Sequence, residues 1–254
     1  MATSQVSSIA NSKTKPANGV SDRSWHFGDG ATATTSEKKC IEIDPYGLGR
    51  TIAANYKLMI SGFVPRPISL LSTQSKDGTS SNLAPFSYSQ MVNVDPPIFI
   101  VGFTTPDSGG HKDSLRNLLE SGECVINIVS ENFVEAANAC SLDAPYGKSE
   151  WAWSGLTKAA STTVGPSRVK ESIFSIEGKL SRTVDFDSRI TPGSTSGTMA
   201  IIEGTRFWVR EDALDERNCI DLDVLKPISR LGGITYGKTV VARTISRPRW
   251  EEAQ

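Results

Sequence analysis

The chain has 254 residues, with 27 Lys and Arg against 28 Asp and Glu, so its formal net charge is -1. That balance argues against a protein that binds nucleic acid through a basic surface without regard to sequence. Cys40, Cys124, Cys140 and Cys219 lie far apart in a chain with 2 histidines, so the spacing matches no zinc or iron–sulfur motif. We therefore expect reduced thiols, no metal site and no nucleic-acid partner.

Residues 1–39 are rich in Ser, Thr, Asn and Lys and poor in large apolar side chains, a composition that does not bury enough surface to fold. We expect a flexible arm at 1–39, one folded domain at 40–246 and a tail at 247–254. The sequence shows no signal-peptide pattern and no apolar run near the roughly 18 residues of a membrane span. A cytoplasmic protein that contacts no membrane is expected.

Short β-type runs dominate the remainder of the chain. They are bounded by Gly, Pro, Asp or Asn and predict strands at 67–73, 87–93, 98–104, 124–129, 174–181, 199–209 and 239–244. A helix is expected over 113–121, because Leu115, Leu118 and Leu119 share one face and Gly122 follows. Residues 131–139 are a second helix candidate, and 212–214 form a short turn. Many strands with few helices favour a barrel or sandwich over a doubly wound sheet.

The segment 66–90, RPISLLSTQSKDGTSSNLAPFSYSQ, joins strand signals to many hydroxyl side chains. Ser69, Ser72 and Thr73 lie on the first expected strand, and residues 82–87 are expected to turn into the next. Hydroxyls and backbone amides that converge at such a turn bind phosphate groups. The alternative is that the hydroxyls form the solvent face of an antiparallel strand and that Pro85 is a turn residue.

A second polar cluster, His111, Lys112, Asp113 and Ser114, stands at the start of the expected helix. Free amides and the positive end of the helix dipole favour an anion there, and Lys112 adds a full charge. Alternatively, Asp113 caps the helix and Lys112 is a solvated side chain. We interpret His111 as a hydrogen-bonding residue rather than a catalyst or metal ligand.

Four motifs in order resemble the flavin reductase-like, FMN-binding split-barrel proteins. RPISLLST with DGTSSNLAPFSYSQ is similar to the opening strands and flavin loop of that family, and HKDSLRNLLESGECVINIV to its phosphate segment. SEWAWSGLT with SIEGKL, and then PISRLGGITYG, complete a similarity that runs from Tyr56 to Tyr236. The chain departs from the family pattern at Ser114 (usually Thr), Trp151 (usually Phe) and Gly178 (usually Cys).

This resemblance implies a mainly β fold, a split β-barrel with a few covering helices, that binds FMN and uses NADH or NADPH as hydride donor. The cofactor-binding residues it implies, together with the polar clusters above, are Arg66, Ser69, Ser72, Thr73, Asn82, Leu83, Ala84, Pro85, Phe86, Ser87, His111, Lys112, Asp113 and Ser114. Trp151, Arg230 and Tyr236 are candidates for a substrate pocket, although packing in the core or at a dimer interface is an alternative for the two aromatic residues. Direct hydride transfer needs no acid–base residue, so no catalytic side chain is nominated.

The function expected is therefore an FMN-dependent oxidoreductase that passes hydride from NAD(P)H to free flavin or to a small organic substrate. The alternatives are an FMN-containing oxidase or oxygenase of specialised metabolism, and a non-catalytic flavin-binding electron carrier, since a fold does not choose among them.

A homodimer is also expected. The continuous apolar run at 98–103, with Val92 near it, is typical of a strand buried on both faces, for which a symmetric partner is the natural cover. The alternative is that the helices at 113–121 and 131–139 of the same chain cover that face.

Overall fold

A computed structural model describes residues 25–31, 39–239, 241–242, 245 and 247–253. Ile52–Lys238 forms one compact unit, and the described residues outside it belong to a second unit that holds a 3-10 helix at Trp250–Ala253. Most of the arm expected at 1–39 lies outside the described residues. In the strand expected at 239–244, residues 239, 241 and 242 are not in a strand, and 240, 243 and 244 lie outside the described residues. The expected domain boundaries stay predictions.

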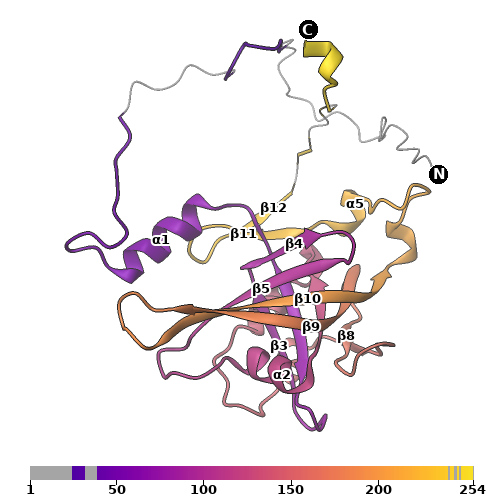
Figure 1. The fold of residues 1–254 in the computed structure, drawn as a ribbon. Coiled ribbons are helices and arrows are strands. Elements are labelled where there is room, and N and C mark those ends of the chain that lie inside the picture. Colours follow the sequence, from indigo (N-terminus) through magenta and orange to yellow (C-terminus); the bar gives the residue numbers. More distant parts are fainter. Residues whose placement is uncertain (1–24, 32–38, 240, 243–244, 246, 254) are drawn as a thin grey trace, which may run out of the picture. The chain divides into compact units, whose positions relative to one another are not determined.

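The compact unit is built around a sheet of seven antiparallel strands in the order β3-β2-β6-β9-β10-β5-β4 (Figure 1). Its strands are β2 (Ser69–Gln74), β3 (Ser81–Phe86), β4 (Ser89–Asn93), β5 (Ile98–Thr104), β6 (Glu123–Ile128), β9 (Phe174–Asp187) and β10 (Thr195–Val209). The two edge strands, β3 and β4, are joined by Ser87 and Tyr88 alone. Because so short a link cannot cross a flat sheet of seven strands, the sheet must curl until its edges meet. A hydrogen bond of 2.7 Å between Ser69 Oγ and Ser89 Oγ joins β2 to β4 at this closure.

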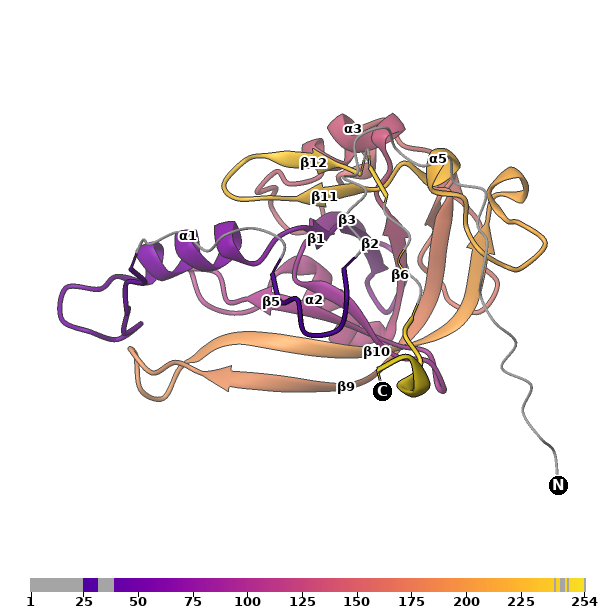
Figure 2. The ribbon, with the colours of Figure 1, turned by 90° about the horizontal axis from the view of Figure 1, so that it is seen from above.

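A smaller sheet of β1 (Arg66–Pro67), β11 (Ile228–Arg230) and β12 (Tyr236–Lys238) stands apart from the long β9 and β10 strands (Figure 2). It joins the barrel where Val129 N donates to the Ile68 carbonyl at 3.3 Å and Ile228 N donates to the Val129 carbonyl at 3.0 Å. Strands β7 (Lys158–Ala159) and β8 (Arg168–Val169) form a separate pair. The second sheet is therefore attached to the barrel by backbone hydrogen bonds through Val129.

The longer helices are α1 (Ile52–Gly62), α2 (Asp113–Ser121) and α3 (Val134–Ala139), and the short ones are α4 (Trp151–Ser154) and α5 (Leu222–Leu225). Helix α2 packs Leu115 and Leu118 into the core beside Val101 and Phe103 of β5, which explains its apolar stripe. It ends at Gly122, whose φ of 73° suits glycine and whose amide donates to the Leu118 carbonyl at 2.9 Å.

Several elements confirm the sequence predictions. Strand β5 and helix α2 have the predicted bounds, β9 extends the strand expected at 174–181, and α3 follows a 3-10 turn, Glu131–Phe133, within the expected helix at 131–139. The turn expected at 212–214 is a 3-10 turn at Glu211–Ala213.

The turn predicted at 82–87 is wrong. Ser81–Phe86 is strand β3, which pairs with β2 along its whole length, and the turn lies earlier, where Asp77 Oδ1 accepts hydrogen bonds from Ser75 Oγ at 2.6 Å and from Thr79 N at 3.1 Å. Pro85 is tolerated in this strand because β3 is an edge of the sheet.

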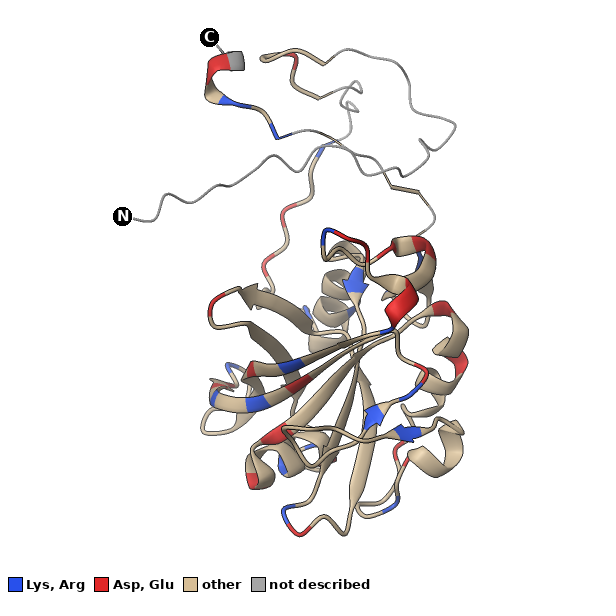
Figure 3. Cartoon of the chain, turned by 90° about the vertical axis from the view of Figure 1, so that its right-hand side faces the viewer, with Lys and Arg blue, Asp and Glu red and all other residues tan. Residues whose placement is uncertain are grey.

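In the single chain, the apolar run at 98–103 is buried to different extents. Val101 and Phe103 are buried in the core, whereas Ile98 and Ile100 are partly buried. Val92 is 52% exposed. Lys and Arg are interspersed with Asp and Glu over the unit (Figure 3). In the described part of the chain, no helix is long and apolar enough to cross a membrane.

Candidate functional site

A cavity of about 630 Å³ lies where the β3–β4 link, the start of α2 and the β1–β11 sheet come together. This volume is in the range of small-molecule sites. Of the predicted site residues, those that line the cavity are Arg66, Asn82, Ala84, Pro85, Phe86, Ser87, His111, Lys112, Asp113, Ser114 and Arg230. Ser69, Ser72, Thr73, Leu83, Trp151 and Tyr236 do not line it.

The residues outside the cavity have other surroundings. Ser69, Ser72 and Thr73 are buried along β2, next to β3, and are at most 2% exposed. Leu83 and Trp151 belong to the core cluster on the far side of β3, where Leu83 is fully buried. The alternative in which the β2 hydroxyls form a solvent face is therefore wrong, because these residues are buried.

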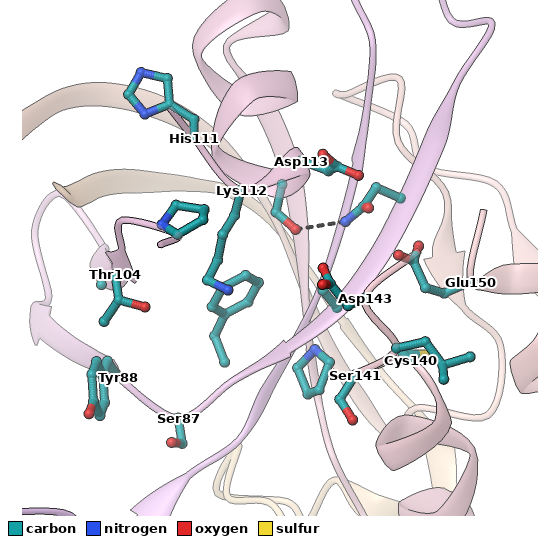
Figure 4. A pocket seen from close by; sticks show the side chains of 18 of the residues that line it. Ser87, Tyr88, Thr104, His111, Lys112, Asp113, Cys140, Ser141, Asp143 and Glu150 are labelled. Atoms are coloured by element: carbon teal, nitrogen blue, oxygen red, sulfur yellow. Dashed lines mark hydrogen bonds between the residues drawn. The ribbon is translucent and has the colours of Figure 1, made fainter. Parts of the chain in front are cut away.

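The start of α2 forms one wall of the cavity. Lys112 occupies the N-cap position, and no side chain among the described residues caps the helix, so the alternative in which Asp113 is the cap is wrong. Lys112 extends into the cavity, whereas the ring of His111 points away from its middle (Figure 4). The wall therefore offers an ammonium group beside helix amides to which no described side chain is hydrogen-bonded.

A buried polar network joins this helix to strand β3. Asn82 and Ser114 side chains are 2.7 Å apart, and Leu83 N donates to Glu150 Oε2 at 3.0 Å. The Asn82 amide is best satisfied when its oxygen accepts from Ser114 Oγ and its nitrogen donates to Glu150 Oε1 at 3.2 Å. Because Glu150 is only 5% exposed, burial raises its pKa, although the hydrogen bond from the Leu83 amide opposes this rise. The network fixes the spacing between β3 and the helix start.

Sequence reasoning missed Glu150 and Asp143, both of which line the cavity. As isolated letters they are indistinguishable from surface charges, and the signal that could have found Glu150 is its place in the SEW motif of the resemblance. Burial raises the pKa of Asp113, and the Asp143 carboxylate adds to that rise, while Arg116 and Lys112 oppose it. The helix start thus combines Lys112 with two carboxyl groups.

Another wall is formed by the small sheet, from which Arg66 and Arg230 line the cavity. Arg66 is held by backbone carbonyls, and the Arg230 guanidinium lies 4.5 Å from the centre of the Tyr236 ring. Tyr236 therefore does not line the cavity itself but packs against Arg230, which does.

The remaining walls come from the link between β3 and β4, from β5 and from the end of α3. A Cβ atom on Gly102 would lie 3.2 Å from Tyr88 Cβ, so glycine lets the link pass close over β5. Cys140 lines the cavity as a free thiol that burial holds at a pKa of about 11, which leaves it protonated and unreactive. No metal-binding group of His, Cys, Asp and Glu occurs among the described residues.

Comparison with known proteins identifies relatives over most of the chain. A family model described as "Flavin reductase like domain" matches residues 61–225. The chain is 32% identical over 208 residues to an uncharacterized protein of Halalkalibacterium halodurans, covering 82% of this chain and 97% of that protein.

Solved structures agree with this match. Nitrilotriacetate monooxygenase component B from Bacillus cereus is similar at 32% identity and a TM-score of 0.76, over 82% of this chain and 100% of that chain. The 2-nitrobenzoate 2-nitroreductase of Pseudomonas fluorescens is similar at 29% identity and a TM-score of 0.71, over 83% and 98% of the two chains. A Shewanella frigidimarina protein with a split barrel domain shares the fold at 20% identity, with a TM-score of 0.64 over 79% and 93% of the two chains. The predicted mainly β split barrel is thereby confirmed.

Proposed function

Because the chain belongs to the flavin reductase-like family, we propose that its cavity binds FMN and that the protein is an FMN-dependent oxidoreductase using NADH or NADPH as hydride donor. The observation that carries this proposal is the meeting of Lys112 and the uncapped start of α2 with strand β3 in one cavity of about 630 Å³. The start of α2 can bind an anion, and strand β3 beside it carries no charged side chain. This arrangement suits a molecule with a phosphate at one end and a flat ring at the other.

The residues of the cavity fit this cofactor. Lys112 and the first amides of α2 would hold the phosphate, while Ala84, Pro85 and Phe86 would lie against the ring and the Ser87 hydroxyl would donate or accept a hydrogen bond at its edge. When bound, FMN supplies the hydride chemistry at its ring. The protein has to hold donor and ring in register and exclude water, which needs no acid–base side chain.

Two carboxyl groups work against the phosphate. Asp113 and Asp143 also line the cavity near Lys112, and a like charge close to an anion weakens its binding. Lys112 and the helix amides must outweigh that repulsion, and the raised pKa of Asp113 reduces it. The affinity for FMN therefore depends strongly on Lys112.

The acceptor of the electrons is proposed to be free flavin or a small organic molecule. Among the similar proteins at about 30% identity, one is a component of a monooxygenase and another is a nitroreductase, whose name gives a precedent for a small organic acceptor. The four cysteines are unpaired, which suits a reducing, cytoplasmic compartment.

A homodimer is proposed as the working form. Met91, Val92 and Val94 are 58%, 52% and 78% exposed at the end of β4, beside the half-buried Ile98 and Ile100 of β5. A symmetric partner on this apolar surface would remove it from water. Light scattering on the FMN-loaded protein is expected to give twice the chain mass of 27.4 kDa, and a mass of one chain would contradict the dimer.

Anaerobic titration of the FMN-loaded protein with NADH and NADPH tests the activity. Bleaching of the flavin absorbance by either donor, followed by many turnovers when free FMN is added, is the result expected of a reductase. Bound flavin that neither donor reduces would contradict this function and favour the oxidase or electron-carrier alternative.

A further inference from the structure

Three residues form a row across the small sheet on the cavity side. In the antiparallel register Arg66 is opposite Arg230, and Arg230 is opposite Tyr236. Directly opposite residues of neighbouring strands project from the same face of a sheet, and like charges in that position repel each other. The pairing of two arginines therefore needs a compensating feature.

Arg66 is held rigidly but keeps its charge uncompensated. Its Nη1 donates to the carbonyls of Ile60 at 2.6 Å and Phe63 at 2.7 Å, and its Nη2 donates to the Leu231 carbonyl at 3.0 Å. Its Nε lies 3.4 Å from Ser87 Oγ. All these partners are neutral, although Arg66 is only 5% exposed. A buried charge whose partners are all neutral dipoles favours an anion nearby.

Arg230 is positioned by an anchored ring. Its guanidinium lies 4.5 Å from the centre of the Tyr236 ring, and the Tyr236 hydroxyl donates to Asn138 Oδ1 of α3 at 2.6 Å. A guanidinium that stacks on an aromatic face keeps its N–H groups available in the ring plane. Tyr236 thus fixes the orientation of Arg230 without consuming the hydrogen-bond donors of the guanidinium.

In the described part of the chain, neither arginine has an acidic partner. Among the described residues, no Asp or Glu forms an ion pair with Arg66 or Arg230. The acidic residues that line the cavity are Asp113, Asp143 and Glu150, and none of the three forms an ion pair with either arginine. The sheet wall is therefore a positively charged surface that faces a cavity and that no carboxylate of the described residues neutralises through an ion pair.

We infer that Arg230, with Arg66 opposite it on the neighbouring strand, is a second anion-binding subsite that receives the negatively charged group of the ligand exchanging hydride or electrons with the flavin. This inference rests on the proposed function, in which Lys112 on the other wall holds the FMN phosphate. The group bound is an oxyanion, a phosphate or a carboxylate, because a planar guanidinium binds either through two parallel N–H donors. Arg230 thereby selects charged second ligands over neutral ones of the same shape.

The test compares charged and neutral ligands of the FMN-loaded protein. One arm follows anaerobic reduction by NADH and NADPH, which carry phosphates, and by 1-benzyl-1,4-dihydronicotinamide, which carries none. The other arm follows the flavin spectrum during titration with benzoate and with neutral benzamide. The variants are Arg230→Gln, Arg230→Lys and Tyr236→Leu. Lys170→Gln is the matched control, since Lys170 is exposed and does not line the cavity.

Arg230→Gln is expected to raise the half-saturating concentration of the charged ligand at least tenfold and to leave that of its neutral counterpart within twofold. Arg230→Lys should recover part of the loss, and Tyr236→Leu, which keeps the charge but removes its support, should give a smaller loss than Arg230→Gln. A loss confined to NADH and NADPH identifies a phosphate as the anion, and a loss confined to benzoate identifies a carboxylate.

Equal losses for charged and neutral ligands would overturn the inference, because Arg230 would then act on the flavin itself. No loss in either arm would also overturn it. Titration of each variant with FMN comes first: variants that bind FMN like the wild type are folded at the site. A wild-type protein that binds no FMN would overturn the proposed function together with this inference, whereas the other two outcomes overturn the inference alone.

Discussion

Replacing Lys112 with Met removes the one ammonium group at the start of α2 while keeping a side chain of similar length. A hydrogen bond to a charged group contributes about 1.5–3 kcal/mol. Because Lys112 is exposed and solvent screens its charge, we expect the lower part of that range, about 1.5–2 kcal/mol. This loss corresponds to a dissociation constant for FMN that is about tenfold to thirtyfold larger.

The assay is titration of flavin fluorescence at fixed ionic strength, with FMN and riboflavin measured in parallel. Riboflavin lacks the phosphate, so its affinity should change less than twofold. Lys148→Met is the control, since Lys148 is an exposed lysine that does not line the cavity. Equal losses for FMN and riboflavin, or an unchanged affinity for FMN, would refute the assignment of Lys112 to the phosphate.

Three further predictions follow from the carboxyl groups. Asp143→Asn should tighten FMN binding about twofold to fivefold, the effect of an exposed charge pair, and weaker binding in the same titration would contradict the proposed repulsion. Glu177 is fully buried, and the hydrogen bonds that it accepts from Thr162, Thr163 and Trp208 outweigh the effect of burial and hold its pKa at about 2. Because this pKa is below the value of 4.5 expected in the unfolded chain, the ionised carboxylate stabilises the fold above pH 4.5. This stabilisation is lost as the pH falls towards 2. Glu177→Gln should therefore lower the free energy of unfolding in urea by about 3 kcal/mol at pH 7 and by much less below pH 3; a difference that does not depend on pH would be inconsistent with this account. Burial raises the pKa of Glu150, so ionisation of this carboxyl group lowers the stability of the folded protein as the pH rises. The stability of Glu150→Gln relative to the wild type should therefore increase between pH 4 and pH 7. A decrease would show that the hydrogen bond from the Leu83 amide dominates.

Local patterns predicted the elements that local physics determines. Leu115, Leu118 and Gly122 specify helix α2 because apolar spacing and a left-handed C-terminal residue are properties of one short segment. Strand β3 was missed because Asn82 and Pro85 are residue types that favour turns. They are acceptable in this strand because β3 lies at the edge of the sheet. The resemblance identified the family, which the comparisons confirm.

The contacts that shape the site are long-range, which is why the sequence alone did not reveal them. Glu150 accepts a hydrogen bond from a residue 67 positions away, and Arg66 reaches a carbonyl 165 positions away. Arg66 lies opposite Arg230 because of the register between two short strands, and no sequence periodicity predicts that register. Helix α1 was also missed, since much of its apolar surface is exposed and its pattern gives no clear inward face.

A crystal structure of the protein grown with FMN would show directly where the phosphate and the flavin ring bind. We expect the phosphate at the start of α2, within hydrogen-bond distance of Lys112 Nζ. We expect the flavin ring against Ala84, Pro85 and Phe86 of β3, with Arg230 beside the part of the cavity that the cofactor leaves open. A phosphate bound to Arg66 and Arg230 instead, or FMN bound outside the cavity, would contradict the proposed site.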